Sequence, residues 1–292
     1  AAMIRLDAFA YATKKAGSSC FFIEPDVWEF LKECEDIVKP YGVVLLPEIH
    51  EHYTMQSKIA EKDYYVYDFA LPMLLINALY YGQSKYLKEW FRICPRKQFT
   101  TLDTHDGIGV VDVKDLLPDE EIERTKEDIF KYGANVKKIY NTAAYNNLDI
   151  YQVNCSYYSA LGDDDKAYIL ARAIQFFAPG IPQVYYVGLL AGKNDLKLLE
   201  ETKVGRNINR HYYNVDEIAQ EVERPVVKEL LRLMEFRNTH TAFDGEFLME
   251  SCGDDELQIL RKNGNEWARL QANLRDKTYK IEYTLNSQVH IF

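Results

Sequence analysis

Three short apolar segments, each leading into acidic residues, constrain the fold of this chain more than any other feature of its sequence. The segments span residues 3–9, 43–50 and 101–107, and each has the composition of a β-strand. Stretches with helical periodicity separate them, so strands and helices alternate along the chain. This alternation, with acids at the strand ends, is typical of a (β/α)8 barrel, in which catalytic groups lie at the C-terminal ends of the strands. We therefore predict the α/β fold class and a (β/α)8 barrel.

The first of these segments carries two charges on one face. Ile4 and Leu6 alternate with Arg5 and Asp7, and residues two apart in a strand point the same way. The pattern predicts an inward ion pair, and pairing with Arg5 keeps the Asp7 carboxylate ionised. An ionised carboxylate held by a guanidinium is suited to act as a covalent nucleophile. A buried ion pair with a purely structural role fits the same pattern.

The other two segments supply further acids. The second delivers Glu48 at its C-terminal end, and the third delivers His105 and Asp106. Two carboxylates at neighbouring strand ends can cleave a glycosidic bond, because one attacks the anomeric carbon while the other protonates the leaving oxygen. We predict that the carboxylates of Asp7 and Glu48 lie about 5–5.5 Å apart. We expect Asp106 to bind sugar hydroxyls more tightly in the transition state, and His105 to donate a hydrogen bond to a hydroxyl.

The bulk properties of the chain exclude some classes of partner. The 292 residues are 47% hydrophobic, which is enough for one barrel-sized unit and a small appendage. The formal net charge is −10 without a basic run, which argues against nucleic acid and against an anionic membrane as partners. No apolar run approaches membrane-spanning length and no signal-peptide pattern appears, so we expect a cytoplasmic protein.

Neither a metal nor a cofactor is indicated by the spacing of the residues. The five cysteines are scattered without a CxxC or CxH pattern. His50, Glu51 and His52 could form a metal cluster with Glu48, but no further His or Cys group joins them. The segment 106–109 lacks the third glycine and the following helix of a dinucleotide-binding loop. We therefore expect no metal and no cofactor.

The rest of the chain divides into a long α/β part and a short β part. Further strands are expected over 64–71 and 183–187, and 140–154 is expected to be a long functional loop. Helices are expected over 25–38, 55–62, 117–132, 165–177 and 224–237, with two short ones over 72–93. From about residue 243, short alternating runs separated by turn residues predict an antiparallel β domain. We therefore predict a catalytic domain over 1–242 and a small β domain over 243–292.

The three acidic segments resemble three conserved regions of glycoside hydrolase family 13, the α-amylase superfamily. Within that family, residues 102–109, 149–154 and 205–213 closely resemble the sucrose phosphorylase subfamily. The resemblance covers nearly the whole chain. It implies a glycosyltransferase that phosphorolyses sucrose to α-D-glucose 1-phosphate and fructose through a covalent glucosyl-enzyme, with retention of configuration. The implied partners are sucrose, inorganic phosphate, fructose and glucose 1-phosphate.

The resemblance also assigns roles to individual residues. It implies that Asp7 is the nucleophile, Glu48 the general acid/base and Asp106 the stabiliser of the transition state. Arg5 would orient Asp7, while His105 and Arg206 would contact the glucosyl ring and an acceptor-side loop would meet fructose or phosphate. The implied substrate-binding residues are Arg5, His105, Asp149, Tyr151, Gln152 and Arg206.

The resemblance begins at the fourth barrel strand, so we expect only strands 4 to 8 here, as the C-terminal part of such an enzyme. Five strands cannot close an eight-stranded barrel, and two open edges would remain. We therefore expect the chain to be inactive by itself unless a partner supplies the missing N-terminal part. Three other interpretations stay open: a phosphorylase acting on sucrose 6'-phosphate or a glucosylated small acid, an ordinary α-glucosidase, and an inactive fragment that acts only as a binding or partner chain.

Overall fold

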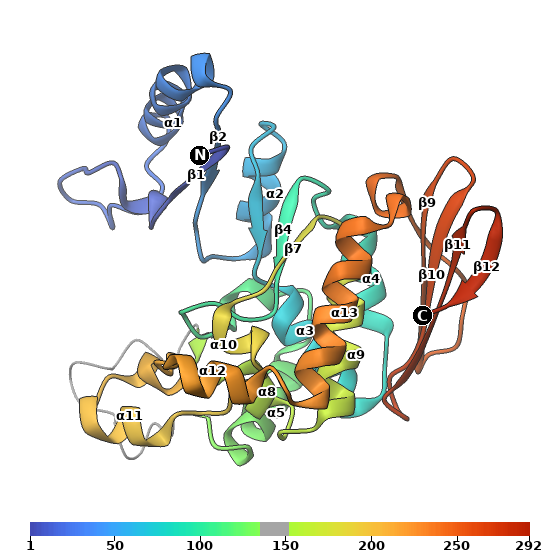
Figure 1. Ribbon diagram of the computed structural model, residues 1–292. Helices are drawn as coiled ribbons and strands as arrows, with labels where there is room; N and C mark the ends of the chain where they lie inside the picture. Colours follow the sequence, from blue (N-terminus) through green and yellow to red (C-terminus); the bar gives the residue numbers. More distant parts are fainter. Residues whose placement is uncertain (135–151) are drawn as a thin grey trace.

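The computed structural model describes residues 1–134 and 152–292 (Figure 1). Its first two thirds alternate parallel strands with helices, as the sequence predicts. Two strands pair in one parallel sheet and three in another, in the order β3-β4-β7. These strands are β1 (Met3–Leu6), β2 (Val44–Pro47), β3 (Val66–Asp68), β4 (Gln98–Thr101) and β7 (Ile181–Gln183). Within the described residues the two sheets do not close into a ring, so the chain forms part of a barrel.

Helices pack around these strands. The longer ones are α1 (Asp26–Val38), α2 (Tyr53–Ala60), α3 (Leu71–Tyr81), α4 (Lys85–Ile93), α5 (Asp119–Lys131), α9 (Asp165–Phe177) and α13 (Pro225–Thr239). The shorter ones are α8 (Tyr157–Ala160), α10 (Tyr186–Leu189), α11 (Leu196–Thr202) and α12 (Val215–Glu221). Helix α9 starts at residue 165 because the Asp164 side chain accepts hydrogen bonds from the Lys166 and Ala167 amides. Among the described residues, no helix is both long and apolar enough to cross a membrane.

Two predicted strands differ from the structure in their position. Strand β4 ends at Thr101, so His105 and Asp106 lie in the loop after it and not in the strand itself. Strand β7 shares only residue 183 with the predicted strand 183–187, of which residues 186 and 187 lie in the short helix α10. The second error arises because a short apolar run does not distinguish a buried strand from a buried helical turn.

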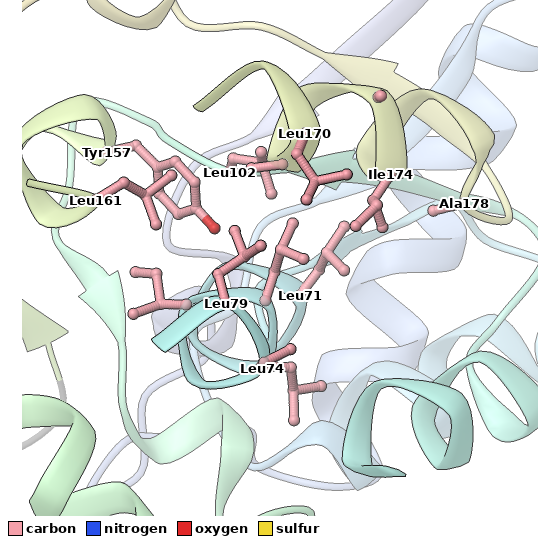
Figure 2. Close-up of a cluster of buried hydrophobic side chains, with 14 of the residues drawn as sticks. Leu71, Leu74, Leu79, Leu102, Tyr157, Leu161, Leu170, Ile174 and Ala178 are labelled. Carbon is pink, nitrogen blue, oxygen red and sulfur yellow. The ribbon is translucent and has the colours of Figure 1, made fainter. Parts of the chain in front are cut away.

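The main core surrounds helices α3 and α9. Figure 2 shows Leu71 and Leu79 of α3 on the side of that helix that faces Leu170 and Ile174 of α9, all of them nearly inaccessible to solvent. This apolar contact holds the second parallel sheet and its loops in place. The segment that contains β1, α1, β2 and α2 buries a separate, smaller group of side chains.

A five-stranded antiparallel sheet follows α13, in the order β12-β11-β10-β9-β8 (Figure 1). Its strands are β8 (Glu246–Met249), β9 (Glu256–Asn263), β10 (Glu266–Asn273), β11 (Thr278–Leu285) and β12 (Gln288–Ile291). All of them lie within the predicted segment 243–292. The inward side chains of β9 and β10 belong to the same buried cluster as α9. Since the sheet shares this core with the α/β part, the division into two domains at residue 242 stays a prediction.

Candidate active site

The three predicted catalytic carboxylates line one cavity of about 420 Å³, to which Asp7, Glu48 and Asp106 all contribute. Asp7 follows β1, Glu48 follows β2, and Asp106 lies in the loop after β4. Strands β1 and β2 are parallel, so their C-terminal ends meet at one edge of the sheet. The three acids therefore converge from segments that lie up to 100 residues apart in the sequence.

Other predicted residues line the same cavity: His105, Gln152 and Arg206. Arg5 lines an adjoining cavity of about 180 Å³, which shares Glu48 and Asp106 with the first. Asp149 and Tyr151 lie outside the described residues. Seven of the nine predicted site residues are thus brought to one place.

Arg5 links the first two carboxylates. Its Nη1 lies 2.7 Å from Asp7 Oδ1, and its Nη2 lies 3.7 Å from Glu48 Oε2. The prediction of an inward, buried pair is wrong, because the Asp7 side chain is 74% exposed. The physical reason is that β1 is an edge strand, which pairs only with β2 among the described residues. The expected 5–5.5 Å separation of the Asp7 and Glu48 carboxylates stays a prediction.

Glu48 is buried, with 7% of its surface exposed. Its Oε2 accepts a hydrogen bond of 2.8 Å from the Ala8 backbone N–H, which fixes the carboxylate beside the end of β1. Its Oε1 lies 3.6 Å from Nε2 of His50. A buried carboxylate with a backbone donor on one oxygen and an imidazole near the other is suited to exchange a proton with a bound ligand.

Asp106 is surrounded by positive groups. Its Oδ1 forms a short ion pair with Arg206 Nη1 and lies 3.6 Å from Arg210 Nη2, while its Oδ2 lies 3.6 Å from His105 Nε2. Burial raises the pKa of Asp106, but the hydrogen bond from Arg206 and the positive charges of His105, Arg206 and His50 outweigh it. The pKa of Asp106 therefore lies below its ordinary value, and the carboxylate is anionic at neutral pH.

The loop that carries His105 and Asp106 is held by two side chains that the sequence did not single out. Asn209 Nδ2 donates to the carbonyl oxygens of Thr104 at 3.1 Å and of Asp106 at 2.9 Å. Arg210 Nε donates to the carbonyl oxygen of His105 at 2.7 Å. Three consecutive carbonyls are thus bound by two consecutive residues, about 100 positions later. Both residues fall within the segment 205–213 that carried the family resemblance, which was their only signal.

Gln152 supports the same loop from the other side. It opens β6 (Gln152–Val153), which pairs antiparallel with β5 (Ile108–Gly109). Its Oε1 accepts a hydrogen bond of 3.2 Å from the Gly107 N–H. A Cβ at Gly107 would lie 2.9 Å from Gln152 Cβ and from the Val153 carbonyl oxygen, so this close approach requires glycine.

The geometry bears on the possible metal cluster. His52 does not join Glu48, since its Nε2 lies 3.1 Å from Asp115 instead. Glu48, His50 and Asp106 do offer oxygen and nitrogen atoms within 4.8 Å of one another. The protein's own cations already face these carboxylates, however, because Arg206 pairs with Asp106 and Arg5 approaches Glu48. Added positive charge is therefore disfavoured here.

Among characterised proteins, the chain is similar to several phosphorylases. It is 59% identical over 294 residues to the sucrose phosphorylase of Streptococcus mutans, and the match covers 99% of this chain and 61% of that protein. It is 44% identical to the glucosylglycerol phosphorylase of Marinobacter adhaerens, with 97% of this chain and 59% of the relative covered. The chain thus spans about three fifths of the length of these relatives. No protein-family model matches it.

Solved structures show the same partial coverage. The crystal structure of sucrose 6F-phosphate phosphorylase from Thermoanaerobacter thermosaccharolyticum superposes with a TM-score of 0.92 at 42% identity, covering 99% of this chain and 60% of that one. The α-amylase from H. orenii superposes with a TM-score of 0.59 at 15% identity, covering 92% of this chain and 50% of that one, which speaks for the fold alone. The predicted barrel fold, present here in part, is confirmed.

Proposed function

We propose that this chain carries the catalytic carboxylates of a retaining glucosyl-transferring enzyme. Its resemblance to the sucrose phosphorylases of glycoside hydrolase family 13 is confirmed by these matches. The proposed reaction is the phosphorolysis of sucrose to α-D-glucose 1-phosphate and fructose. The observation that carries the proposal is the convergence of Asp7, Glu48 and Asp106 on one cavity. A retaining transfer needs a nucleophilic carboxylate and an acid/base carboxyl group that lie close together in one cavity.

The first step would form a covalent intermediate. An Asp7 carboxylate oxygen attacks the anomeric carbon of the glucosyl unit, and the bond from that carbon to the fructosyl oxygen breaks. Glu48 gives its proton to the leaving oxygen, so fructose departs as a neutral molecule. Arg5 Nη1 lies 2.7 Å from Asp7 Oδ1 and orients the carboxylate for the attack.

The second step would release the product. A phosphate oxygen attacks the anomeric carbon from the face that fructose has left, and the bond to Asp7 breaks. Glu48, now ionised, accepts a proton from the phosphate, which restores both carboxyl groups to their starting states. Two displacements at one carbon give retention of configuration. Asp106 stays anionic throughout, and its charge stabilises the positive charge that develops on the ring.

Basic side chains lie around the cavity, which suits the binding of a phosphate. Arg206 and His105 line the cavity, and Arg210 Nη2 lies 3.6 Å from Asp106 Oδ1. Arginine binds phosphate oxygens through paired donors, so these groups would draw the anion toward the intermediate. Sucrose is the proposed glucosyl donor, and sucrose 6'-phosphate is the nearest alternative, because relatives at 44% identity include a sucrose 6(F)-phosphate phosphorylase and a glucosylglycerol phosphorylase.

We propose that activity requires the part of the relatives that these 292 residues do not cover. The fraction of the relatives that it does not cover is about two fifths, and its two parallel sheets keep open edges in the described residues. We propose that a fragment equivalent to this missing part completes the barrel and the sugar pocket. We also propose that the protein works in the cytoplasm, where the five cysteines would stay reduced.

The test is a complementation assay. The 292-residue chain is assayed alone and with the missing N-terminal part of the Streptococcus mutans relative, and the release of glucose 1-phosphate from sucrose is measured with and without phosphate. We expect product only with both parts and only with phosphate. Asp7→Asn should abolish it, whereas Asp36→Asn, which changes an exposed acid on α1, should not. Glucose released at equal rates without phosphate would contradict phosphorolysis and indicate a glucosidase.

A second comparison separates the sibling activities. The complemented enzyme is given sucrose, sucrose 6'-phosphate and glucosylglycerol at equal concentrations. The proposal expects the highest kcat/KM for sucrose. No turnover of any glucoside by the complemented enzyme would leave only a binding or partner role for the chain.

A further inference from the structure

A buried histidine separates two carboxylates at the wall of the cavity. His50 follows Glu48 by two residues, and its side chain is 11% exposed. Its Nε2 lies 3.6 Å from Glu48 Oε1, and its Nδ1 lies 3.7 Å from Asp112 Oδ2. Each ring nitrogen therefore faces one carboxylate. A neutral imidazole can donate from only one nitrogen, whereas an imidazolium can donate from both.

His50 is the basic side chain that faces the Asp112 carboxylate. It lies in the short 3-10 helix η3 (Val111–Val113) with 1% of its surface exposed. Neither of its carboxylate oxygens has a hydrogen-bond partner among the described residues, and His50 is the only basic side chain there with a nitrogen within 4 Å. An isolated buried carboxylate is costly unless an opposite charge faces it.

The backbone makes room for this arrangement. A Cβ at Gly109 would lie 2.1 Å from Asp112 Oδ2, so only glycine allows the carboxylate to occupy its position. On the other side, the His50 ring stacks on Phe69, with ring centroids 3.6 Å apart and planes 16° apart. Stacking fixes the plane of the ring, and an aromatic face favours a positively charged partner. His50 is thus held in one orientation between its two carboxylates.

We propose that Asp112 is a positioning residue that acts through His50, holding the ring as an imidazolium between itself and Glu48. The positive ring would then set the proton affinity of Glu48, the group that must give and regain a proton in each turnover. This inference rests on the proposed function only for the role of Glu48. The charge state of His50 itself is independent of any substrate.

The surrounding charges agree with this assignment. Burial lowers the pKa of His50, but the contact with Asp112 and the negative charges of Asp112, Glu48 and Asp106 outweigh burial and raise it. Burial and, to a smaller extent, the charge of Asp112 raise the pKa of Asp68 to about 6, so a further acid interacts electrostatically with Asp112. The nearest fixed cation on the Glu48 side is Arg5, 3.7 Å from that carboxylate.

The first test follows the histidine rings directly. Two-bond proton–nitrogen spectra of the 292-residue chain report the protonation of each of its six histidines, and His50→Gln identifies the His50 signals. We expect His50 to be an imidazolium at pH 7. Asp112→Asn should lower its titration midpoint by about one pH unit or more, because the paired charge is removed. A neutral His50 at pH 7 in the unmutated chain would overturn the proposal without any variant.

The matched control uses another Asp–His pair. Asp115 lies 3.1 Å from His52 Nε2, at the surface and outside the cavity. Asp115→Asn should alter the His52 signals and leave those of His50 unchanged, while Asp112→Asn should do the opposite. Unchanged His50 titration in Asp112→Asn would overturn the proposal.

The second test addresses Glu48 in the complemented enzyme. Asp112→Asn should remove the positive charge of the ring that faces Glu48, and so shift the acid/base limb of the pH–rate profile of kcat to higher pH. In a His50→Gln background the same substitution should no longer shift that limb. A fall in thermal stability with an unshifted profile would assign Asp112 a purely structural role and contradict the proposal. Failure of sucrose phosphorolysis would leave the ring titration as the deciding measurement.

Discussion

Single side chains from distant segments fix the geometry of the loop of residues 104–106. Asn209 and Arg210 bind the three carbonyls of residues 104–106, and Arg206 neutralises the Asp106 carboxylate. The loop backbone has no strand or helix of its own to satisfy these groups. Its conformation therefore depends on donors that arrive from about 100 residues later in the chain.

The Asn209 amide should be essential for this loop. Asn209→Ala would leave two partly buried carbonyls without their donor, so we expect the free energy of unfolding to fall by about 1–3 kcal/mol. Urea titration followed by circular dichroism measures the change. Asn207→Ala is the control, because its amide bonds Thr202 at an exposed position, and it should cost less than about 0.5 kcal/mol. Equal losses of unfolding free energy in the two variants would contradict the role of Asn209 in holding the loop.

The Asp106–Arg206 pair should give the chain a pH-dependent stability. The folded pKa of Asp106 is lowered, so its contribution is present above the unfolded value of about 3.9 and is lost as the pH falls through the folded pKa. We therefore expect Arg206→Met to be less stable than the unmutated chain at pH 6, with the difference shrinking below about pH 4. Thermal unfolding across this range measures it, and a difference independent of pH would argue against the pair.

Helix α9 contributes a buried arginine to the core. Arg172 is fully buried, and its Nη2 lies 2.6 Å from Oδ2 of Asp103, the residue just before the loop of residues 104–106. Gln175, one turn later, donates to the carbonyl oxygens of Thr100 and Gln183 at the ends of β4 and β7. One helix face thus joins two strands and the start of the loop.

Removing the buried charge should therefore be costly. Arg172→Met would leave the Asp103 carboxylate buried and unpaired, and we expect the free energy of unfolding to fall by about 3–5 kcal/mol. Arg232→Met in α13 is the matched control, since Arg232 pairs with Glu229 at the surface and should contribute at most about 1 kcal/mol. Chemical denaturation of both variants measures the free energy of unfolding, and similar losses in the two variants would contradict this prediction.

At the scale of the whole molecule, the main feature is that both parallel sheets have open edges among the described residues. Ile4 and Val44 at one sheet and Ile181 at the other are 38%, 41% and 44% exposed. Apolar side chains on unpaired strand edges favour association with further strands. The proposed occupant is the part of the relatives that these 292 residues do not cover.

Binding of that part should stabilise the chain by mass action. We expect the thermal midpoint of the 292-residue chain to rise as the complementary fragment of the Streptococcus mutans relative is added, in a concentration-dependent way. Ile4→Asp should weaken this rise, because a charge would then face the incoming strand. Ile37→Asp, at a 70% exposed position on α1, should not. No rise at any fragment concentration would contradict complementation.

The sequence by itself indicated the alternation of strands and helices and singled out the acids Asp7, Glu48 and Asp106, which follow β1, β2 and β4 in the chain. These follow from local periodicity and from the position of polar residues after apolar runs, which are properties of neighbouring residues. The family resemblance added Arg206, for which no spacing rule exists.

Only the tertiary structure decided how these groups are charged and held. The exposure of Asp7, the Asn209 clamp, the Arg172–Asp103 pair and the Asp112–His50–Glu48 line all depend on contacts across strands, helices and loops. Periodicity describes one segment at a time, whereas these contacts depend on which segments pack together and how deeply they are buried. Burial and opposing charge set the protonation of each group, and both exist only once the chain has folded.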